Sequence, residues 1–259
     1  MKNPKNILIT GASSGIGAAL ALHYAQAGIS LFISGRNEDP LQEVADQCRA
    51  KGAEVESALV DVTHQKEMEN WIIQANEDIP LDLVIANAGI ASKGEYDSGK
   101  LLDLTRKVFD VNVTGVFNTI EPALEIFKTR DDPCQIAIVS SLAGYRGWAS
   151  APAYTASKGA VRFYGEALRG SLKETPIQVN VICPGFVRSR ITDENEFKMP
   201  FFMEADKAAK IICQGLEKNK GRIAFPWPMN FAVWLISVLP DCLAQKLVQE
   251  MPAKEALIK

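Results

Sequence analysis

Near its amino terminus the chain reads Asn6-Ile-Leu-Ile-Thr10-Gly11-Ala-Ser13-Ser14-Gly15-Ile16-Gly17. A short apolar β-run over residues 6–10 leads into this glycine turn, and a helical run over residues 18–26 follows it. Glycines let the backbone approach a pyrophosphate, and the start of a helix offers unpaired N–H groups and a positive dipole. The context predicts a phosphate-binding turn. A tight turn without a ligand is the alternative.

Strands and helices alternate through the rest of the chain. We expect further strands at residues 30–34, 55–60, 81–86, 135–140, 177–183 and 222–225. We expect helices between them at residues 41–51, 66–75, 101–127, 153–172 and 204–218. Asn112 and Gly115 inside the apolar 101–127 run suggest a local kink. The alternation predicts an α/β fold, a single Rossmann-type domain with a doubly wound parallel sheet.

Composition narrows the classes of function. The chain has 259 residues, is 47% hydrophobic and carries a net charge of −3, which fits one globular domain. This balance gives no reason to expect nucleic acid as a partner. The five cysteines are odd in number and form no Cys-x-x-Cys pair, so we read them as small buried side chains in a reducing, cytoplasmic setting. No signal peptide is visible, and the two histidines lack a second ligand at metal spacing.

Polar and small residues follow several of the expected strands. Ser34-Gly35-Arg36 ends the second strand without an acid that would bind a ribose 2′-hydroxyl, and a guanidinium suits a 2′-phosphate. We therefore expect NADP(H) rather than NAD(H), with a solvated loop charge as the alternative for Arg36. Asp61-Val62 follows the third strand, where Asp61 could meet an adenine amino group or only cap a turn. Asn87-Ala88-Gly89 follows the fourth, and its small residues would let backbone lie along a cofactor.

Tyr154-Thr-Ala-Ser-Lys158 opens the expected helix at residues 153–172. Positions i and i+4 share one face of a helix, so the phenol and the ammonium are neighbours. A nearby positive charge lowers the pKa of a phenol, which would let Tyr154 exchange a proton near neutral pH. Tyr96-Asp-Ser-Gly-Lys100 has the same spacing, but its glycine and polar residues predict a loop.

Taken together, the motifs resemble the short-chain dehydrogenase/reductase family over roughly residues 7–189. They include the glycine turn, Asn87-Ala88-Gly89, Asn112, Ser141, the Tyr154/Lys158 pair and Pro184-Gly185. The resemblance implies that Tyr154 is the acid/base, Ser141 holds the substrate oxygen, Lys158 lowers the Tyr154 pKa and binds ribose, and Asn112 holds a relay water. Its implied cofactor site comprises Thr10, Gly11, Ser13, Ser14, Gly15, Ile16, Gly17, Ser34, Arg36, Asp61, Val62, Asn87, Ala88, Gly89, Tyr154, Lys158, Pro184, Gly185, Val187 and Ser189.

The sequence departs from the family in two places. Ala86 stands where the family often has a first Asn, so that residue's structural hydrogen bonds must come from elsewhere. Ser189 stands where Thr is common, and it keeps the hydroxyl. The decoy Tyr96 has Leu83 at the offset at which Tyr154 has Ser141, which excludes it as the acid/base.

The substrate is predicted only by composition. We expect residues 188–203 to form a lid carrying Phe197, Met199, Phe201, Phe202 and Met203, and residues 226–259 to form an apolar extension. If both border the cleft, the small-molecule carbonyl or alcohol is bulky and lipid-like; packing in the core or between subunits is the alternative. The apolar stretch 231–239 is too short to span a membrane but could touch one. The resemblance also implies a homodimer or homotetramer.

Two other functions are compatible with parts of the pattern. One is a non-catalytic NADP(H)-binding regulatory protein, which would have no need of the full Asn112/Ser141/Tyr154/Lys158 set. The other is an epimerase or dehydratase of nucleotide sugars, which would need a larger carboxy-terminal domain than the residues after Ser189 provide. The sequence therefore favours a ketone–alcohol oxidoreductase.

Overall fold

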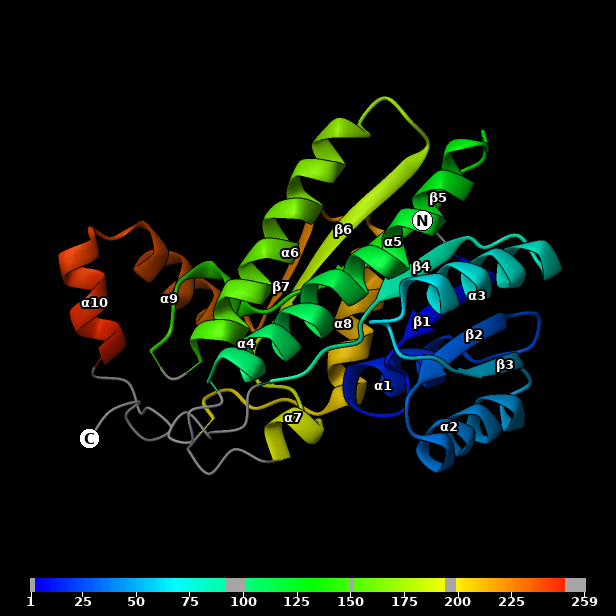
Figure 1. Cartoon of the computed structure of the whole chain (residues 1–259), viewed down its shortest axis with the longest axis horizontal. Coiled ribbons are helices and arrows are strands. Elements are labelled where there is room, and N and C mark those ends of the chain that lie inside the picture. The colour runs from blue at the N-terminus through cyan, green and yellow to red at the C-terminus, as the bar shows by residue number, and fades with distance from the viewer. Residues whose placement is uncertain (1–2, 92–100, 150, 194–198, 250–259) are drawn as a thin grey trace.

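A computed structural model describes residues 3–91, 101–149, 151–193 and 199–249 (Figure 1). Seven parallel strands form one sheet in the order β3-β2-β1-β4-β5-β6-β7. The strands are β1 (Asn6–Thr10), β2 (Ser30–Gly35), β3 (Glu54–Leu59), β4 (Leu83–Ala86), β5 (Cys134–Val139), β6 (Ile177–Pro184) and β7 (Arg222–Phe225). The expected doubly wound parallel sheet is confirmed.

Helices cover both faces of this sheet. One face carries α1 (Gly15–Tyr24), α2 (Glu38–Ala50) and α8 (Ala205–Glu217), and the other carries α3 (Gln65–Asp78), α5 (Gly115–Lys128) and α6 (Pro152–Ser171), with α4 (Leu101–Phe109) against α6. Successive residues of a strand point to opposite faces of the sheet. Ile7 and Ile9 pack toward α1, and Leu8 packs toward α3 and α5. Both sides of β1 are therefore buried, which explains its unbroken apolar run.

The strand order reverses between β1 and β4. Chain connections leave in opposite directions from these two neighbours, so a crevice forms beyond their carboxyl ends. Gly11 follows β1 and Asn87 follows β4, which brings the glycine turn beside the Asn87 segment. The topology places the candidate site at this edge of the sheet.

The helix expected at residues 101–127 is divided. A five-residue π-helix, Asp110–Thr114, separates α4 from α5 and contains Asn112. Its wider turn is the local irregularity that the polar residue suggested. Gly115 has a different role from the one expected: a Cβ there would lie 2.5 Å from Cγ2 of Val62. Glycine at this position lets α5 approach the loop after β3.

Several expected boundaries also shift. The strand expected at 81–86 begins at Leu83, and the helix expected at 66–75 extends to Asp78. Two short helical segments, a 3₁₀ turn at Leu142–Tyr145 and α7 (Arg190–Asp193), lie in connections expected to be irregular. Of the cysteines, Cys242 is exposed and the other four are buried, so the expectation of buried thiols is wrong at one position. Both histidines are exposed.

The carboxy-terminal part adds α9 (Trp227–Val238) and α10 (Asp241–Gln249) at one end of the molecule, in red in Figure 1. Ile236 packs against Ala244 and Val248 of α10. Another face of α9 is open: Trp227 is 77% exposed, and Phe231 and Trp234 are about half exposed. None of the described helices is both long and apolar enough to cross a membrane.

Candidate active site

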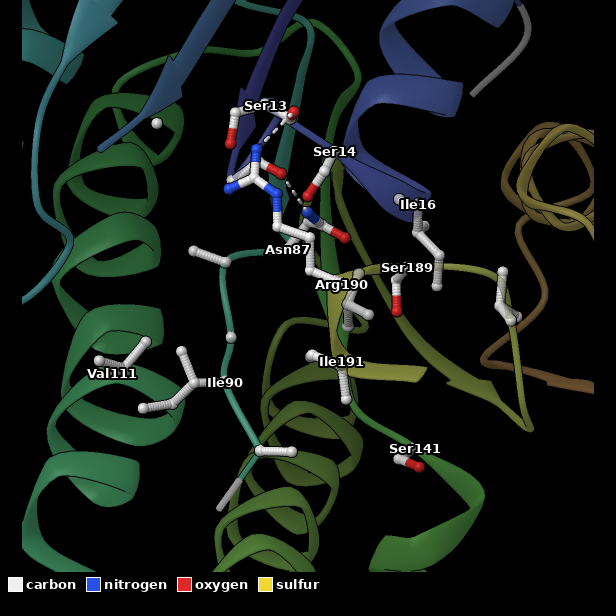
Figure 2. A pocket seen from close by; sticks show the side chains of 18 of the residues that line it. Ser13, Ser14, Ile16, Asn87, Ile90, Val111, Ser141, Ser189, Arg190 and Ile191 are labelled. Atoms are coloured by element: carbon white, nitrogen blue, oxygen red, sulfur yellow. Dashed lines mark hydrogen bonds between the residues drawn. The ribbon is translucent and has the colours of Figure 1, made fainter. Parts of the chain in front are cut away.

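A cleft of about 440 Å³ opens at the carboxyl ends of the strands, where the topology predicted one (Figure 2). Its walls come from the glycine turn, the loops after β2, β3 and β4, the start of α6 and the segment after β6. The expected site residues that line it are Gly11, Ser13, Ser14, Gly15, Ile16, Arg36, Asp61, Val62, Asn87, Ala88, Gly89, Ser141, Tyr154, Lys158, Pro184, Gly185, Val187 and Ser189. Segments far apart in sequence thus meet in one cleft.

The glycine turn is shaped by close backbone contacts. Gly11 and Gly15 have φ angles of +66° and +56°, in the region that favours glycine. A Cβ on Gly11 would lie 2.8 Å from Cα of Ala88, and one on Gly15 would lie 2.8 Å from Cβ of Ser189. The turn and its neighbours therefore form a narrow cradle that side chains at these positions would fill. Such a cradle beside the start of α1 fits a dinucleotide pyrophosphate.

Three expected cofactor residues lie behind the cleft and do not line it. The Thr10 hydroxyl accepts hydrogen bonds from the backbone N–H groups of Asn87 and Ala88, at 3.1 and 3.2 Å. A Cβ on Gly17 would lie 2.3 Å from the Gly11 carbonyl oxygen. Ser34 is fully buried, and its hydroxyl has no partner among the described residues. Thr10 and Gly17 thus support the turn, while Ser34 is buried and does not line the cleft.

The Asn87 side chain joins the loop after β4 to the loop after β1 by hydrogen bonds. Its amide nitrogen donates to the carbonyl oxygens of Thr10 and Gly11, at 2.9 and 3.1 Å. These bonds hold the two sides of the crevice together without the additional Asn that the family often has at the position of Ala86.

Arg36 and Asp61 meet at the β2–β3 end of the cleft. The guanidinium lies 3.7 Å from the carboxylate of Asp61, an acid that is distant from it in sequence. Burial raises the pKa of Asp61, but hydrogen bonds from Thr63 and the charge of Arg36 outweigh it, so the pKa lies below its usual value. Asp61 therefore caps its own turn through Thr63 and also faces the cleft.

Ser141 and Tyr154 stand together in the cleft. Ser141 follows β5, and its Oγ accepts a hydrogen bond from Ala143 N at 3.1 Å, which caps the 3₁₀ turn. Burial raises the pKa of Tyr154, and hydrogen bonding to the Ser141 hydroxyl lowers it by less. The phenol therefore holds its proton at neutral pH.

Lys158 lies one helical turn from Tyr154 and is 3% exposed. Its ammonium nitrogen donates to the Val139 carbonyl oxygen at 3.0 Å and lies 6.0 Å from the centre of the Tyr154 ring. Burial lowers the Lys158 pKa to about 8. Burial disfavours the charged form of both residues, which raises the Tyr154 pKa and lowers that of Lys158. That Lys158 lowers the Tyr154 pKa stays a prediction.

Asn112 is fully buried in the π-helix and does not line the cleft. Its Oδ1 accepts from Ile90 N at 2.8 Å, and its Nδ2 donates to Ile90 O at 2.9 Å and to Ser157 Oγ at 3.0 Å. A Cβ on Gly89 would lie 3.2 Å from Asn112 Oδ1 and 3.1 Å from Lys158 Nζ. The Asn112 side chain thus fixes the loop after β4 next to Lys158.

The segment after β6 closes the opposite wall. Val187 pairs with Met203 in an isolated parallel bridge, and Arg188 forms an ion pair with Glu204 at 2.7 Å. Met203 is buried, and Phe201 and Phe202 are partly exposed. These three and Met199 do not line the cleft, so the expectation that the lid side chains border it is not met by them. Phe197 and the decoy Tyr96–Lys100 pair lie outside the described residues.

Sequence reasoning missed part of the lining. The additional residues are Gly35, Asn37, Val60, Ile90, Ala91, Val111, Val139, Ser140, Arg190, Ile191 and Thr192. Most of them adjoin a predicted motif, so sequence adjacency could have suggested them. Arg190 had a weak signal as a basic residue just after Ser189. Val111 carried none, because an apolar helical residue is normally a core residue.

Comparison with known proteins gives consistent matches. The family model described as short chain dehydrogenase matches residues 5–199. A Myxococcus xanthus protein described as an uncharacterized oxidoreductase is 38% identical over 242 residues, covering 92% of this chain and 94% of the relative. Mouse 17-beta-hydroxysteroid dehydrogenase 13 is 29% identical over 235 residues, covering 89% and 77%. A crystal structure of a short chain dehydrogenase from Mycobacterium paratuberculosis bound to NAD is 25% identical, with a TM-score of 0.73 and coverage of 86% and 95%.

Proposed function

Because the chain belongs to the short-chain dehydrogenase family, we propose that it interconverts a ketone and a secondary alcohol, with NADP(H) as the cofactor. The observation that carries the proposal is that Ser141, Tyr154 and Lys158 all line the cleft that the glycine turn opens. A phenol beside a hydroxyl can hold a substrate oxygen and exchange a proton with it.

The residues of the cleft would hold the cofactor in sections. The turn from Gly11 to Ile16 would bind the pyrophosphate. The backbone at Ala88 and Gly89 would lie along the bound dinucleotide, and Lys158 would bind its nicotinamide ribose. Pro184, Gly185, Val187 and Ser189 would surround the nicotinamide. A bound reduced nicotinamide supplies a hydride to the carbonyl carbon. The protein's own contribution is to orient the substrate and supply the proton.

Tyr154 would donate that proton from its hydroxyl to the substrate oxygen, while Ser141 holds the same oxygen. Burial keeps the phenol protonated at neutral pH, which is the form that ketone reduction needs. Asn112 would support a proton relay toward Lys158. Both N–H groups of its side-chain amide are used by Ile90 and Ser157, and Oδ1 accepts one bond from Ile90 N, so a second lone pair of Oδ1 is left to accept from a relay water.

Arg36 supports NADP(H) as the preferred cofactor. It stands at the end of β2, lines the cleft and is half exposed, so its guanidinium can reach a 2′-phosphate. Asp61 at 3.7 Å weakens this preference, because a carboxylate repels a phosphate. NAD(H) is the alternative, and the Mycobacterium paratuberculosis relative was solved with NAD.

The substrate we propose is an apolar, lipid-like ketone. Ile90, Val111 and Ile191 line the cleft, as Figure 2 shows, and supply apolar surface. Two relatives, mouse 17-beta-hydroxysteroid dehydrogenase 13 and Arabidopsis thaliana 11-beta-hydroxysteroid dehydrogenase-like 4A, carry names that point to the same chemical class. Residues 188–203 would form the lid over this substrate. Turnover confined to small polar sugars or polyols would exclude the class.

The open apolar face of α9 bears on assembly and location. Trp227, Phe231 and Trp234 are exposed and belong to the proposed extension at residues 226–259. An exposed apolar face of this kind would be covered by the surface of another molecule. A homodimer or homotetramer of a cytoplasmic enzyme is the arrangement we propose, with peripheral membrane contact as the alternative. Quantitative release into the soluble fraction at low salt would argue against the membrane.

Incubation with NADPH and a panel of ketones, followed by the loss of NADPH absorbance, tests the proposed function. An oxidoreductase consumes NADPH with at least one apolar ketone. A non-catalytic NADP(H)-binding regulatory protein would bind the cofactor without consuming it, and this outcome would replace the proposal.

A further inference from the structure

Arg190 lines the cleft, and the proposed chemistry gives it no role. It begins α7, directly after Ser189, and its side chain is exposed. Figure 2 shows this side chain reaching from the segment after β6 to the glycine turn. There the guanidinium donates a hydrogen bond to the Ser13 carbonyl oxygen at 3.5 Å. Arg190 thus connects two walls of the cleft.

Within the described part of the chain, the cationic side chains lining the cleft are Arg36, Lys158 and Arg190. Arg36 lies beside the Asp61 carboxylate, and Lys158 is buried against the Val139 carbonyl oxygen. The Arg190 contact is a long bond to a neutral acceptor. Neither Lys158 nor Arg190 lies beside a described carboxylate, but Lys158 is buried, so Arg190 is the exposed cation of the cleft whose charge is not matched among the described residues. A guanidinium binds phosphate oxygens more strongly than a carbonyl, and often through two parallel bonds.

The backbone beneath Arg190 is held firmly. Ser189 N donates to Thr192 Oγ1 at 2.8 Å, and this buried hydroxyl also lies 2.9 Å from the Val187 carbonyl oxygen. Ser189 packs so closely on Gly15 that a Cβ there would lie 2.8 Å away. Arg190 is therefore fixed next to the amino end of α1, while its long side chain stays exposed.

We infer that Arg190 is a ligand of the cofactor's pyrophosphate. This inference rests on the proposed function, because it requires a dinucleotide in the cleft. The pyrophosphate belongs at the turn from Gly11 to Ile16, beside the point where Ser189 meets Gly15. Arg36, directly after β2, would bind the 2′-phosphate instead. Arg190 then stabilises bound NAD(H) and NADP(H) equally, because both contain the pyrophosphate. Since Arg190 belongs to the proposed lid segment at residues 188–203, this segment would contact the cofactor as well as the substrate.

The test compares the wild-type protein with Arg190→Met, which keeps the length of the side chain and removes its charge. Dissociation constants are measured by titration calorimetry for NADPH, NADH and ADP-ribose, which all contain the pyrophosphate, and for AMP, which lacks it. Losing a charged hydrogen-bonding partner should weaken each of the first three by about tenfold or more. AMP binding should not change. Equal losses for NADPH and NADH are the expected signature.

Arg188→Met is the matched control, because Arg188 belongs to the same segment but pairs with Glu204 and stacks on Phe202. It should leave all four affinities unchanged; a loss equal to that of Arg190→Met would attribute the effect to disturbance of the segment and overturn the inference. Unchanged binding by Arg190→Met, or a loss confined to NADPH, would overturn it too. A wild-type protein that binds neither dinucleotide would reject the proposed function itself.

Discussion

The ammonium nitrogen of Lys158 lies 3.0 Å from the carbonyl oxygen of Val139, in a position where only 3% of the lysine is exposed. One neutral acceptor does not replace the water that a charged ammonium loses on burial. The chain therefore holds a buried cation whose pKa falls from 10.5 to about 8. If function requires a charged lysine here, its burial lowers the free energy of unfolding of the protein.

The desolvation penalty at Lys158 predicts how the Lys158→Met substitution changes the free energy of unfolding. Between pH 8 and 10.5 the unfolded chain binds more protons at this residue than the folded one, so wild-type stability rises with pH across this window. Below pH 8 the penalty is complete and amounts to about 3 kcal/mol, at about 1.4 kcal/mol per pH unit. Losing the bond to Val139 offsets about 1 kcal/mol of the gain. Urea unfolding should show Lys158→Met more stable than wild type at pH 7 by about 2 kcal/mol.

The advantage of the variant should disappear toward pH 10.5. Lys66→Met, at a lysine whose side chain is 77% exposed, is the control and should change stability little at any pH. A Lys158→Met protein that is less stable than wild type at pH 7 would contradict a desolvation penalty at this position.

Tyr154→Phe removes the proposed proton donor and leaves the ring in place. Losing one acid/base group lowers kcat by about 10²–10⁴-fold. NADPH binding should be nearly unchanged, which calorimetry can check. Tyr164→Phe removes a hydroxyl from the same helix, where the ring stacks on Phe117, and should keep full activity. An unaltered kcat in Tyr154→Phe would remove this residue from the mechanism.

Arg36 and Asp61 should tune the choice of cofactor in opposite directions. Arg36→Met should weaken NADPH by about tenfold or more and leave NADH unaffected, because only NADPH carries the 2′-phosphate. Asp61→Asn keeps an acceptor oxygen for Thr63 but removes the charge 3.7 Å from Arg36. It should strengthen NADPH binding. Parallel changes for both cofactors in Arg36→Met would argue that the cofactor is not selected here.

Gly17→Ala tests the packing behind the glycine turn. The new methyl group would lie 2.3 Å from the Gly11 carbonyl oxygen and 2.5 Å from Asn87 Nδ2, so the turn must move. Overpacking of this kind costs about 1–3 kcal/mol, and cofactor affinity should fall with it. Gly170→Ala meets nothing within 4 Å at the end of α6 and should stabilise by up to about 1 kcal/mol. Thermal melts of the two variants should therefore shift in opposite directions.

The sheet could be read from local patterns because each strand carries its own signal. β1 is apolar on both faces and is followed by glycines, and β7 falls at residues 222–225 as expected. Helix ends were less accurate: α3 extends to Asp78, and a π-helix at Asp110–Thr114 divides the helix that the sequence predicted as continuous. The resemblance grouped Ser141 with Tyr154 and Lys158, and the three residues line one cleft, at the edge of the sheet where parallel strands place their carboxyl ends.

The sequence by itself therefore determined the fold class and the glycine turn, because these depend on local periodicity and on the topology that follows from it. The grouping of Ser141 with Tyr154 and Lys158 came from the resemblance to a family. Only the tertiary structure decided the electrostatics. The pairing of Arg36 with Asp61, the burial that raises the Tyr154 pKa and lowers that of Lys158, and the reach of Arg190 to Ser13 all join segments distant in sequence. The energy of a charge depends on what surrounds it in space, and no spacing of residues along the chain contains that information.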